Sequence, residues 1–78
     1  MADLKETLYD IARAIVDNPE EVTILDTEDG KDVKLVLSVA EGDMGKVIGR
    51  NGKNAKAIRT VMKAVAASDG KRVTVDIR

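Results

Sequence analysis

Cysteine and histidine are both absent from this 78-residue chain. Without cysteine, the protein can form neither disulfide bonds nor thiolate metal sites. Without histidine, it lacks the commonest metal ligand and the usual general base near neutral pH. No pair of carboxylates marks an evident catalytic pocket either. We therefore expect no catalytic residue, no metal site and no cofactor, and an enzyme is the least favoured class of function.

Aromatic side chains are almost missing as well, because Tyr9 is the only one. Its isolation excludes the nucleic-acid-binding modules that stack bases on an aromatic platform, such as RRM and OB domains. No apolar run approaches the roughly 18–20 residues of a membrane span, and the N-terminus lacks the apolar core of a secretion signal. We expect a cytoplasmic protein that forms one domain over residues 1–78.

The net charge of −1 hides an uneven distribution of charge along the chain. Residues 44–72 contain eight basic residues and one acid, which gives +7, whereas the rest contains five basic and thirteen acidic residues, which gives −8. A polyanion responds to the local field, because charges farther away than about 8–10 Å are largely screened at physiological salt. The basic segment therefore favours a nucleic-acid ligand although the overall balance does not.

Hydrophobic periodicity predicts a helix followed by a β-hairpin in the first half of the chain. The helix lies in "DLKETLYDIARAIVDNP", where Asp3 fits an N-cap and Pro19 stops the helix. Two β-rich runs follow, "EVTILDT" and "DVKLVLSVA", and the second places Val33, Leu35, Leu37 and Val39 on one face. Asp29-Gly30 between them predicts a type I′ hairpin turn.

The second half predicts two helices and a strand. Asp43 fits the side-chain cap of a short helix, Met44–Ile48. A long helix follows in "GKNAKAIRTVMKAVAASDG", and the chain closes with the strand "KRVTVDIR". The apolar stripe of the long helix consists of Ala55, Ile58, Val61, Met62, Val65 and Ala66. A helical crossover should place the last strand parallel to the second one. We therefore predict an α+β fold, ordered helix-strand-strand-helix-helix-strand, with a three-stranded mixed sheet and three helices on one face.

Three glycines precede the long helix in "MGKVIGRNGKNAKAIRT". Their spacing fits neither a Walker loop nor a dinucleotide fingerprint, because both would need a glycine where Val47 stands. The remaining pattern is G-x-x-G, from Gly49 to Gly52, and we expect Gly49 to end the short helix in the left-handed conformation. Main chain without Cβ atoms would then allow a sugar-phosphate backbone to approach closely.

Purely structural interpretations of this segment stay open. The glycines could serve only to end one helix and begin the next. Asn51-Gly52 could instead form a hairpin turn, but its flanks do not alternate as strands do. The lysines of the long helix, Lys63 above all, could form only a solvated face.

The run "GKVIGRNGKNAKAIRTVM" resembles the core of a KH domain, which binds RNA or single-stranded DNA by clamping about four nucleotides with its GxxG loop. The order of elements resembles the type II, prokaryotic arrangement, and the small size resembles the bacterial KhpA family. The resemblance implies a post-transcriptional regulator or RNA chaperone that binds single-stranded RNA. It also implies a homodimer, or a pair with a larger KhpB-like (Jag-like) KH protein. The alternative is a dimerisation adaptor with weak RNA binding.

The residues expected to bind RNA surround the loop, and they are Gly49, Arg50, Asn51, Gly52, Lys46, Val47, Ile48, Lys53 and Lys56. By the resemblance, the four residues of the GxxG loop form the clamp, and Val47-Ile48 joins the floor of a groove for bases. The lysines lie close enough in sequence to contact phosphates. The chain departs from the broader KH pattern at Ala55, where a larger aliphatic residue is frequent.

Overall fold

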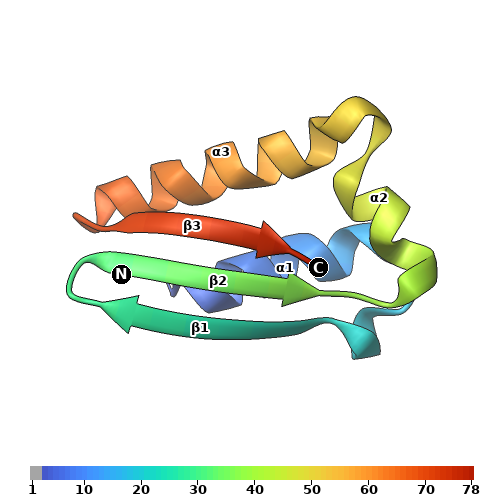
Figure 1. The fold of residues 1–78 in the computed structure, drawn as a ribbon, viewed down its shortest axis with the longest axis horizontal. Coiled ribbons are helices and arrows are strands. Elements are labelled where there is room, and N and C mark those ends of the chain that lie inside the picture. Colours follow the sequence, from blue (N-terminus) through green and yellow to red (C-terminus); the bar gives the residue numbers. More distant parts are fainter. Residues whose placement is uncertain (1–2) are drawn as a thin grey trace.

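The computed structural model describes residues 3–78 and contains the predicted elements in the predicted order (Figure 1). The helices and strands are α1 (Leu4–Ile15), β1 (Thr23–Asp29), β2 (Asp32–Ser38), α2 (Met44–Ile48), α3 (Lys53–Ser68) and β3 (Arg72–Ile77). Single 3-10 turns precede β1, α2 and α3, at Pro19–Glu21, Glu41–Asp43 and Arg50–Gly52. The predicted α+β class is confirmed.

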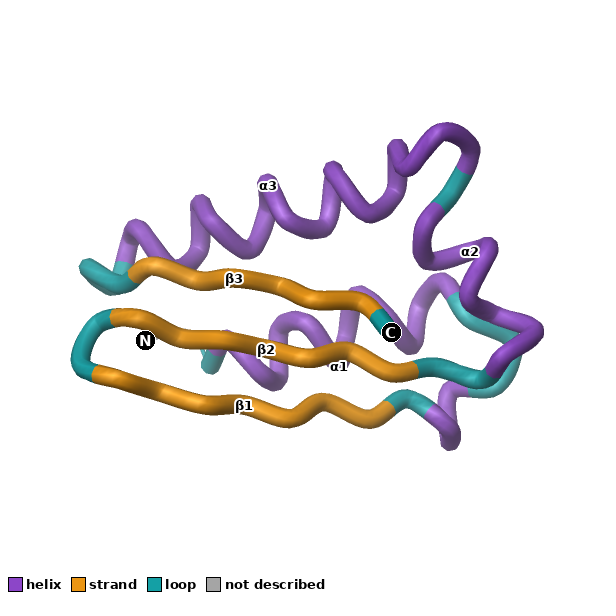
Figure 2. Tube along the Cα trace, viewed as in Figure 1, coloured by secondary structure: helices purple, strands orange, loops and turns teal. Residues whose placement is uncertain are grey.

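The sheet has the order β1-β2-β3, with β2 in the centre. β1 runs antiparallel to β2 and β3 runs parallel to it, as Figure 2 shows. In this register Leu35 lies opposite Asp26 on one side and Val75 on the other. The parallel pairing is confirmed, and it follows from the crossover through α2 and α3, which returns the chain to the start of the sheet.

One face of the sheet is buried beneath the helices. The buried side chains of the strands are Ile24, Val33, Leu35, Leu37, Val73 and Val75. They pack against Leu8, Val47 and Met62 of the three helices, which are fully buried. The opposite face is open, and Leu25 on it is 71% exposed. Within the described part of the chain, every helix is too short or too polar to cross a lipid bilayer.

The hairpin turn differs from the predicted one. Asp29 pairs with Asp32, so the two-residue loop is Gly30-Lys31 and not Asp29-Gly30. Gly30 has a φ of 62°, and Lys31 has no positive φ. A single positive φ at the first loop position suits a type II′ turn, whereas a type I′ turn needs two. The predicted type I′ turn was therefore wrong, because Asp29 belongs to the strand.

The first helix begins at its predicted signal. Asp3 is the N-cap of α1, and its carboxylate accepts a hydrogen bond from the main-chain N–H of Glu6 at 3.3 Å. The helix ends at Ile15, ahead of Pro19, which starts the 3-10 turn. A loop of three residues, 16–18, thus connects α1 to this turn, and it lies against the start of α2 through Asp43.

Asp43 does not cap α2 as predicted. It stands directly before the helix, but its side chain makes no capping hydrogen bond there. The residue is only 1% exposed, and its carboxylate accepts three hydrogen bonds from the loop after α1. The donors are the main-chain N–H of Asp17 (3.2 Å), the main-chain N–H of Asn18 (3.0 Å) and Nδ2 of Asn18 (3.1 Å). The carboxylate turns inward because these donors need an acceptor, and buried polar groups are rarely left unpaired.

The environment of Asp43 favours its charged form. Burial by itself would raise the pKa of this carboxyl group. The hydrogen bonds from Asp17 and Asn18 outweigh that effect, and the charge of Lys46 adds to them, so the pKa of Asp43 lies below its usual value of 3.8. A carboxylate with a lowered pKa in the folded protein stabilises the fold above its unfolded pKa, and this contribution is lost as the pH falls through the lowered value.

We therefore expect the Asp43→Asn variant to unfold at a lower urea concentration than the wild type at neutral pH. The difference should shrink as the pH falls from 3.8 through the lowered pKa, because Asp43 takes up a proton first in the unfolded chain and then in the folded protein too. Unfolding curves across pH would measure this, with Glu41→Gln as the matched control, since Glu41 is a nearby exposed acid. A difference that stays constant with pH would contradict the role of the charge.

Candidate nucleic-acid interface

The GxxG loop lies between α2 and α3, at the end of the molecule opposite the β-hairpin (Figure 1). Gly49 ends α2 with φ 74° and ψ 173°. Its positive φ agrees with the prediction, but its ψ lies outside the left-handed helical region, so the predicted left-handed end was wrong. The left-handed residues are instead Asn51 (φ 57°, ψ 27°) and Gly52 (φ 75°, ψ 14°). Glycine adopts such angles without strain, and asparagine tolerates them better than most residues.

The two glycines of the loop have different reasons to lack a side chain. A Cβ atom on Gly49 would lie 2.6 Å from Cγ of Asn54 and 2.9 Å from its main-chain nitrogen, which is too close for any residue but glycine. A Cβ atom on Gly52 would meet nothing within 4 Å, so glycine is favoured there by its φ alone. The chain's own packing therefore occupies the space beside Gly49, and the space beside Gly52 stays open.

Asn54 connects α3 back to α2. It lies in the first turn of α3, and its Nδ2 donates a hydrogen bond to the main-chain oxygen of Lys46 at 2.7 Å. The bond spans eight residues and closes the loop from the side that faces Gly49. The loop is thus fixed at both ends by the polypeptide itself, and its tip projects between two anchored helices.

Part of the loop's main chain is already paired. The N–H groups of Gly49, Gly52 and Lys53 donate to the carbonyl oxygens of Gly45, Gly49 and Arg50. Among residues 3–78, no main-chain bond is formed by the N–H groups of Arg50 and Asn51. Arg50 lies in the 3-10 turn and Asn51 in the left-handed region, a succession that is typical of main-chain nests, the concavities that bind anions in other proteins.

Lys46 has a carboxylate partner. Its Nζ forms an ion pair and hydrogen bond with Oδ2 of Asp17, the residue whose main-chain N–H binds Asp43. The hydrogen bond to Asp17 raises the pKa of Lys46 above its usual value of 10.5, against the opposing effect of desolvation. Lys46 therefore lies at the predicted site, but its charge is shared with an acid. The pair is exposed, so its net contribution to stability is small.

Other basic side chains near the loop lack such partners. Within residues 3–78, the basic side chains of the 44–72 segment that form no ion pair are Arg50, Lys53, Lys56, Arg59 and Lys63. Arg59 instead donates from Nε to the carbonyl oxygen of Val75, at 3.1 Å. The predicted site residues Arg50, Lys53 and Lys56 follow one another through the loop and the first turns of α3 and are exposed. They therefore concentrate uncompensated positive charge at the loop.

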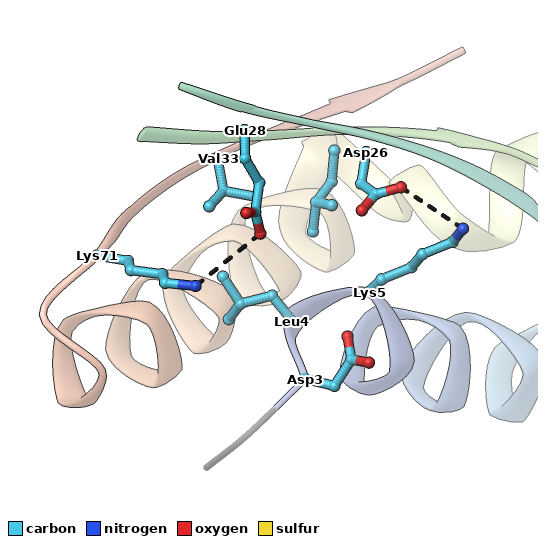
Figure 3. A pocket seen from close by; sticks show the side chains of 8 residues that line it. Asp3, Leu4, Lys5, Asp26, Glu28, Val33 and Lys71 are labelled. Carbon is cyan, nitrogen blue, oxygen red and sulfur yellow. Dashed lines mark ion pairs between the residues drawn. The ribbon is translucent and has the colours of Figure 1, made fainter. Parts of the chain in front are cut away.

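Lys71 and Arg72 lie at the other end of the sheet. Lys71 pairs with Glu28 at 3.9 Å, and Arg72 pairs with Asp32 at 2.8 Å. Lys71 lines a cavity of about 370 Å³ at the N-terminal end of α1, and a second ion pair there joins Lys5 to Asp26 at 3.5 Å. Figure 3 shows both ion pairs. Because its lysines face carboxylates, this cavity offers no free cation to a phosphate.

The structure divides the predicted hydrophobic pair. Val47 is fully buried in the core, whereas Ile48 is 38% exposed. Burying a valine side chain stabilises the fold by about 1.5–3 kcal/mol, so turning Val47 outward to meet a base would cost about that much. Val47 therefore supports the loop from below, and Ile48 is the member of the pair that a ligand can reach.

An apolar cleft of about 260 Å³ lies between α1 and α3, next to the loop. Its lining residues are Ile11, Ile15, Asn54, Ala57, Ile58 and Val61. The periodicity placed Val61 on the buried stripe of α3, but the side chain is 47% exposed. The two helices do not close over it, so α3 carries apolar surface on a flank of the candidate interface.

Four residues that shape this interface were not predicted to do so: Asp17, Asn18, Asp43 and Asn54. Four of the hydrogen bonds they make join positions 25 to 29 residues apart in the chain. Polar side chains of this kind follow no periodic pattern, so the sequence does not distinguish them from ordinary surface residues. The one usable signal was Asp43, an acid ahead of a helix, and it indicated the wrong role.

Known proteins resemble the chain over nearly its whole length. The family described as "KhpA/KhpB, KH domain" matches residues 5–77. A protein of Clostridium acetobutylicum named RNA-binding protein KhpA is 49% identical over 74 residues, which cover 95% of this chain and 99% of that protein. Proteins of the same name from Clostridium perfringens and Chlamydia trachomatis are 46% and 40% identical over 74 residues, again 95% of this chain and 99% and 95% of their own.

These similarities agree with the fold, since the mixed sheet and three helices have the order of the type II KH arrangement. They also agree with the position of the GxxG loop between α2 and α3. The relatives are named as RNA-binding proteins, not as enzymes. The chain therefore belongs to the KhpA/KhpB family of RNA-binding KH-domain proteins.

Proposed function

We propose that this protein is a single KH module that binds single-stranded RNA in the cytoplasm through its GxxG loop. It acts there as a post-transcriptional regulator or RNA chaperone. One observation carries the proposal: the unpaired N–H groups of Arg50 and Asn51 lie beside cations that have no carboxylate partner. A phosphate of the RNA backbone binds in this nest, and the side chains of Arg50, Lys53 and Lys56 supply the long-range attraction.

The two glycines contribute differently to this binding. Gly52 keeps the outer side of the loop free, so the sugar-phosphate backbone can press against the main chain there. Gly49 instead allows Asn54 to pack under the loop and hold it in shape before RNA arrives. A preformed loop loses less conformational entropy on binding, which favours affinity.

Bases would extend from the clamp toward the exposed part of Ile48. The protein has only one aromatic residue, so bases are held by apolar contact and not by stacking on aromatic rings. Since Val47 and Ala55 are buried, the apolar surface that the loop itself offers outside the cleft between α1 and α3 is small. We therefore propose that phosphate contacts dominate affinity and that discrimination between bases is weak.

The double variant Arg50→Asp with Asn51→Asp tests the clamp. It puts two negative charges at the nest and should weaken binding of a short single-stranded RNA by about tenfold or more, with a shallower dependence on salt. Fluorescence anisotropy across salt concentrations would measure both effects. The matched control is Thr27→Asp with Lys31→Asp at the hairpin end, which changes the net charge by the same amount. Wild-type affinity in a correctly folded clamp variant would refute the proposal.

Asp17 should act as a competitor of RNA for Lys46. The Asp17→Asn variant releases Lys46 for a phosphate, so affinity should rise up to about fivefold, the equivalent of a surface ion pair of about 1 kcal/mol. The salt dependence should steepen at the same time. The same substitution combined with Lys46→Met should bring no gain, and a gain in that background would show that Asp17 acts by another route.

A second function, self-association, is favoured by the apolar cleft between α1 and α3. A twofold dimer brings the same patch of both copies together, so a single exposed apolar strip suffices to form one. Val61 is the most exposed large apolar side chain of the cleft. We include a homodimer, or pairing with a larger KH protein of the KhpB type, in the proposed function.

Sedimentation across protein concentrations tests this second function. Val61→Asp should remove a concentration-dependent dimer, while Leu25→Asp on the open sheet face, which is more exposed still, should leave it intact. Addition of a short RNA would show whether association and RNA binding are coupled. A wild type that stays monomeric at all concentrations would contradict the homodimer, and so would a dimer insensitive to Val61→Asp.

A further inference from the structure

The chain contains three asparagines and no glutamine. Asn18 binds Asp43 through Nδ2 and precedes Pro19, which has no N–H group. Asn54 donates from Nδ2 to Lys46 and lies in a helix. Asn51 differs from both: its side chain is exposed, forms no hydrogen bond within residues 3–78, and precedes a glycine.

An asparagine in this setting can react with its own main chain. The nitrogen of the next residue attacks the side-chain carbonyl carbon, a new carbon–nitrogen bond closes a five-membered imide, and the amide nitrogen leaves as ammonia. Water then opens the ring at either carbonyl and yields aspartate or isoaspartate. A following glycine favours ring closure because no Cβ atom obstructs it. The reaction needs water only and no oxidant or cofactor.

We propose that Asn51 is a site of spontaneous deamidation at the tip of the clamp, and that bound RNA protects it. The protection and the effect on affinity rest on the proposed function, whereas the reaction itself does not. The structure limits the reaction to one of the three asparagines, since Asn18 lacks a main-chain nucleophile after it and Asn54 is fixed by its hydrogen bond to α2.

The geometry of the loop explains why RNA should protect. The N–H of Gly52 donates to the oxygen of Gly49 at 3.2 Å, so the nitrogen that would attack Asn51 is held in a hydrogen bond of the turn. Ring closure requires this bond to open. Among residues 3–78, no atom outside the turn would lie within 4 Å of a Cβ on Gly52, so no packed group covers the turn on this side. A phosphate bound to the N–H groups of Arg50 and Asn51 would hold the turn closed.

The product would weaken the clamp in two ways. A carboxylate at position 51 would stand between Arg50 and Lys53 and repel phosphate. Isoaspartate would in addition insert a carbon atom into the main chain, which would move the N–H groups of the nest apart. RNA-free protein would therefore lose its binding capacity with age, and RNA-bound protein would retain it.

Intact-mass measurement with peptide mapping tests the proposal. The full-length protein would be incubated at mildly alkaline pH, alone and with a saturating short RNA. Free wild type should gain the mass of one deamidation, mapped to residue 51. Asn51→Gly, which keeps a residue that tolerates positive φ, should gain none. Isomerisation at Asp29-Gly30 or Asp69-Gly70 leaves the mass unchanged and cannot be confused with it.

RNA should slow the mass gain several-fold, and aged protein should contain a fraction that no longer binds RNA. A stable mass for the free wild type would overturn the proposal, and so would a gain mapped to Asn18 or Asn54. If RNA binds but Asn51 deamidates as fast as in the free protein, RNA binds elsewhere and its protective role is overturned. If the protein binds no RNA when fresh but deamidates at Asn51 on incubation, the proposed function is refuted and the modification site stands.

Discussion

The buried carboxylate of Asp43 is the interaction on which the candidate interface depends. It receives three hydrogen bonds from the loop after α1 and thereby joins the first helix to the start of α2. The same bonds hold Asp17 next to Lys46. The buried carboxylate of Asp43 therefore fixes the position of the exposed ion pair between Lys46 and Asp17. An internal acid thus determines how much of the lysine's charge reaches a ligand. Asp43 thus contributes both to the packing that supports the loop and to the charge beside it.

Beside that anchor, one side-chain hydrogen bond and several main-chain hydrogen bonds fix the loop. Asn54 returns to the carbonyl of Lys46, and only glycine fits in the space left at position 49. Main-chain hydrogen bonds pair the N–H groups of Gly49, Gly52 and Lys53. Those of Arg50 and Asn51 form no such bond within residues 3–78. Under the proposed function, the recognition element is this pair of N–H groups. It would bind any phosphate of an RNA chain and read no base, which would leave sequence preference to Ile48 and its surroundings.

The sequence predicted the elements and their pairing because both follow from periodic patterns. Alternation in Val33, Leu35 and Leu37 identified the buried face, and the crossover length identified the parallel strand. The GxxG loop and its basic neighbours were also found, since they are local in sequence. The pairing of Lys46 with Asp17 and the bond from Asn54 were not, because contacts between polar residues carry no repeat. The same limit explains Asp43, whose place before a helix predicted a cap that the tertiary structure does not form, and Val61, which periodicity alone placed in the core.

The difference between Gly49 and Gly52 brings these points together. Both glycines belong to the GxxG motif. Gly49 makes room for the protein's own Asn54, whereas the space beside Gly52 is open. Under the proposed function, the loop must present main chain that no side chain shields, so Asn51 would be open to water as well as to RNA. Asparagine suits this place because it tolerates positive φ and carries no charge. Its side-chain amide can also lose ammonia when the main-chain nitrogen of Gly52 attacks the side-chain carbonyl carbon. The openness that allows a phosphate to bind is then the same property that exposes the loop to chemical ageing, and occupancy by RNA would be its protection.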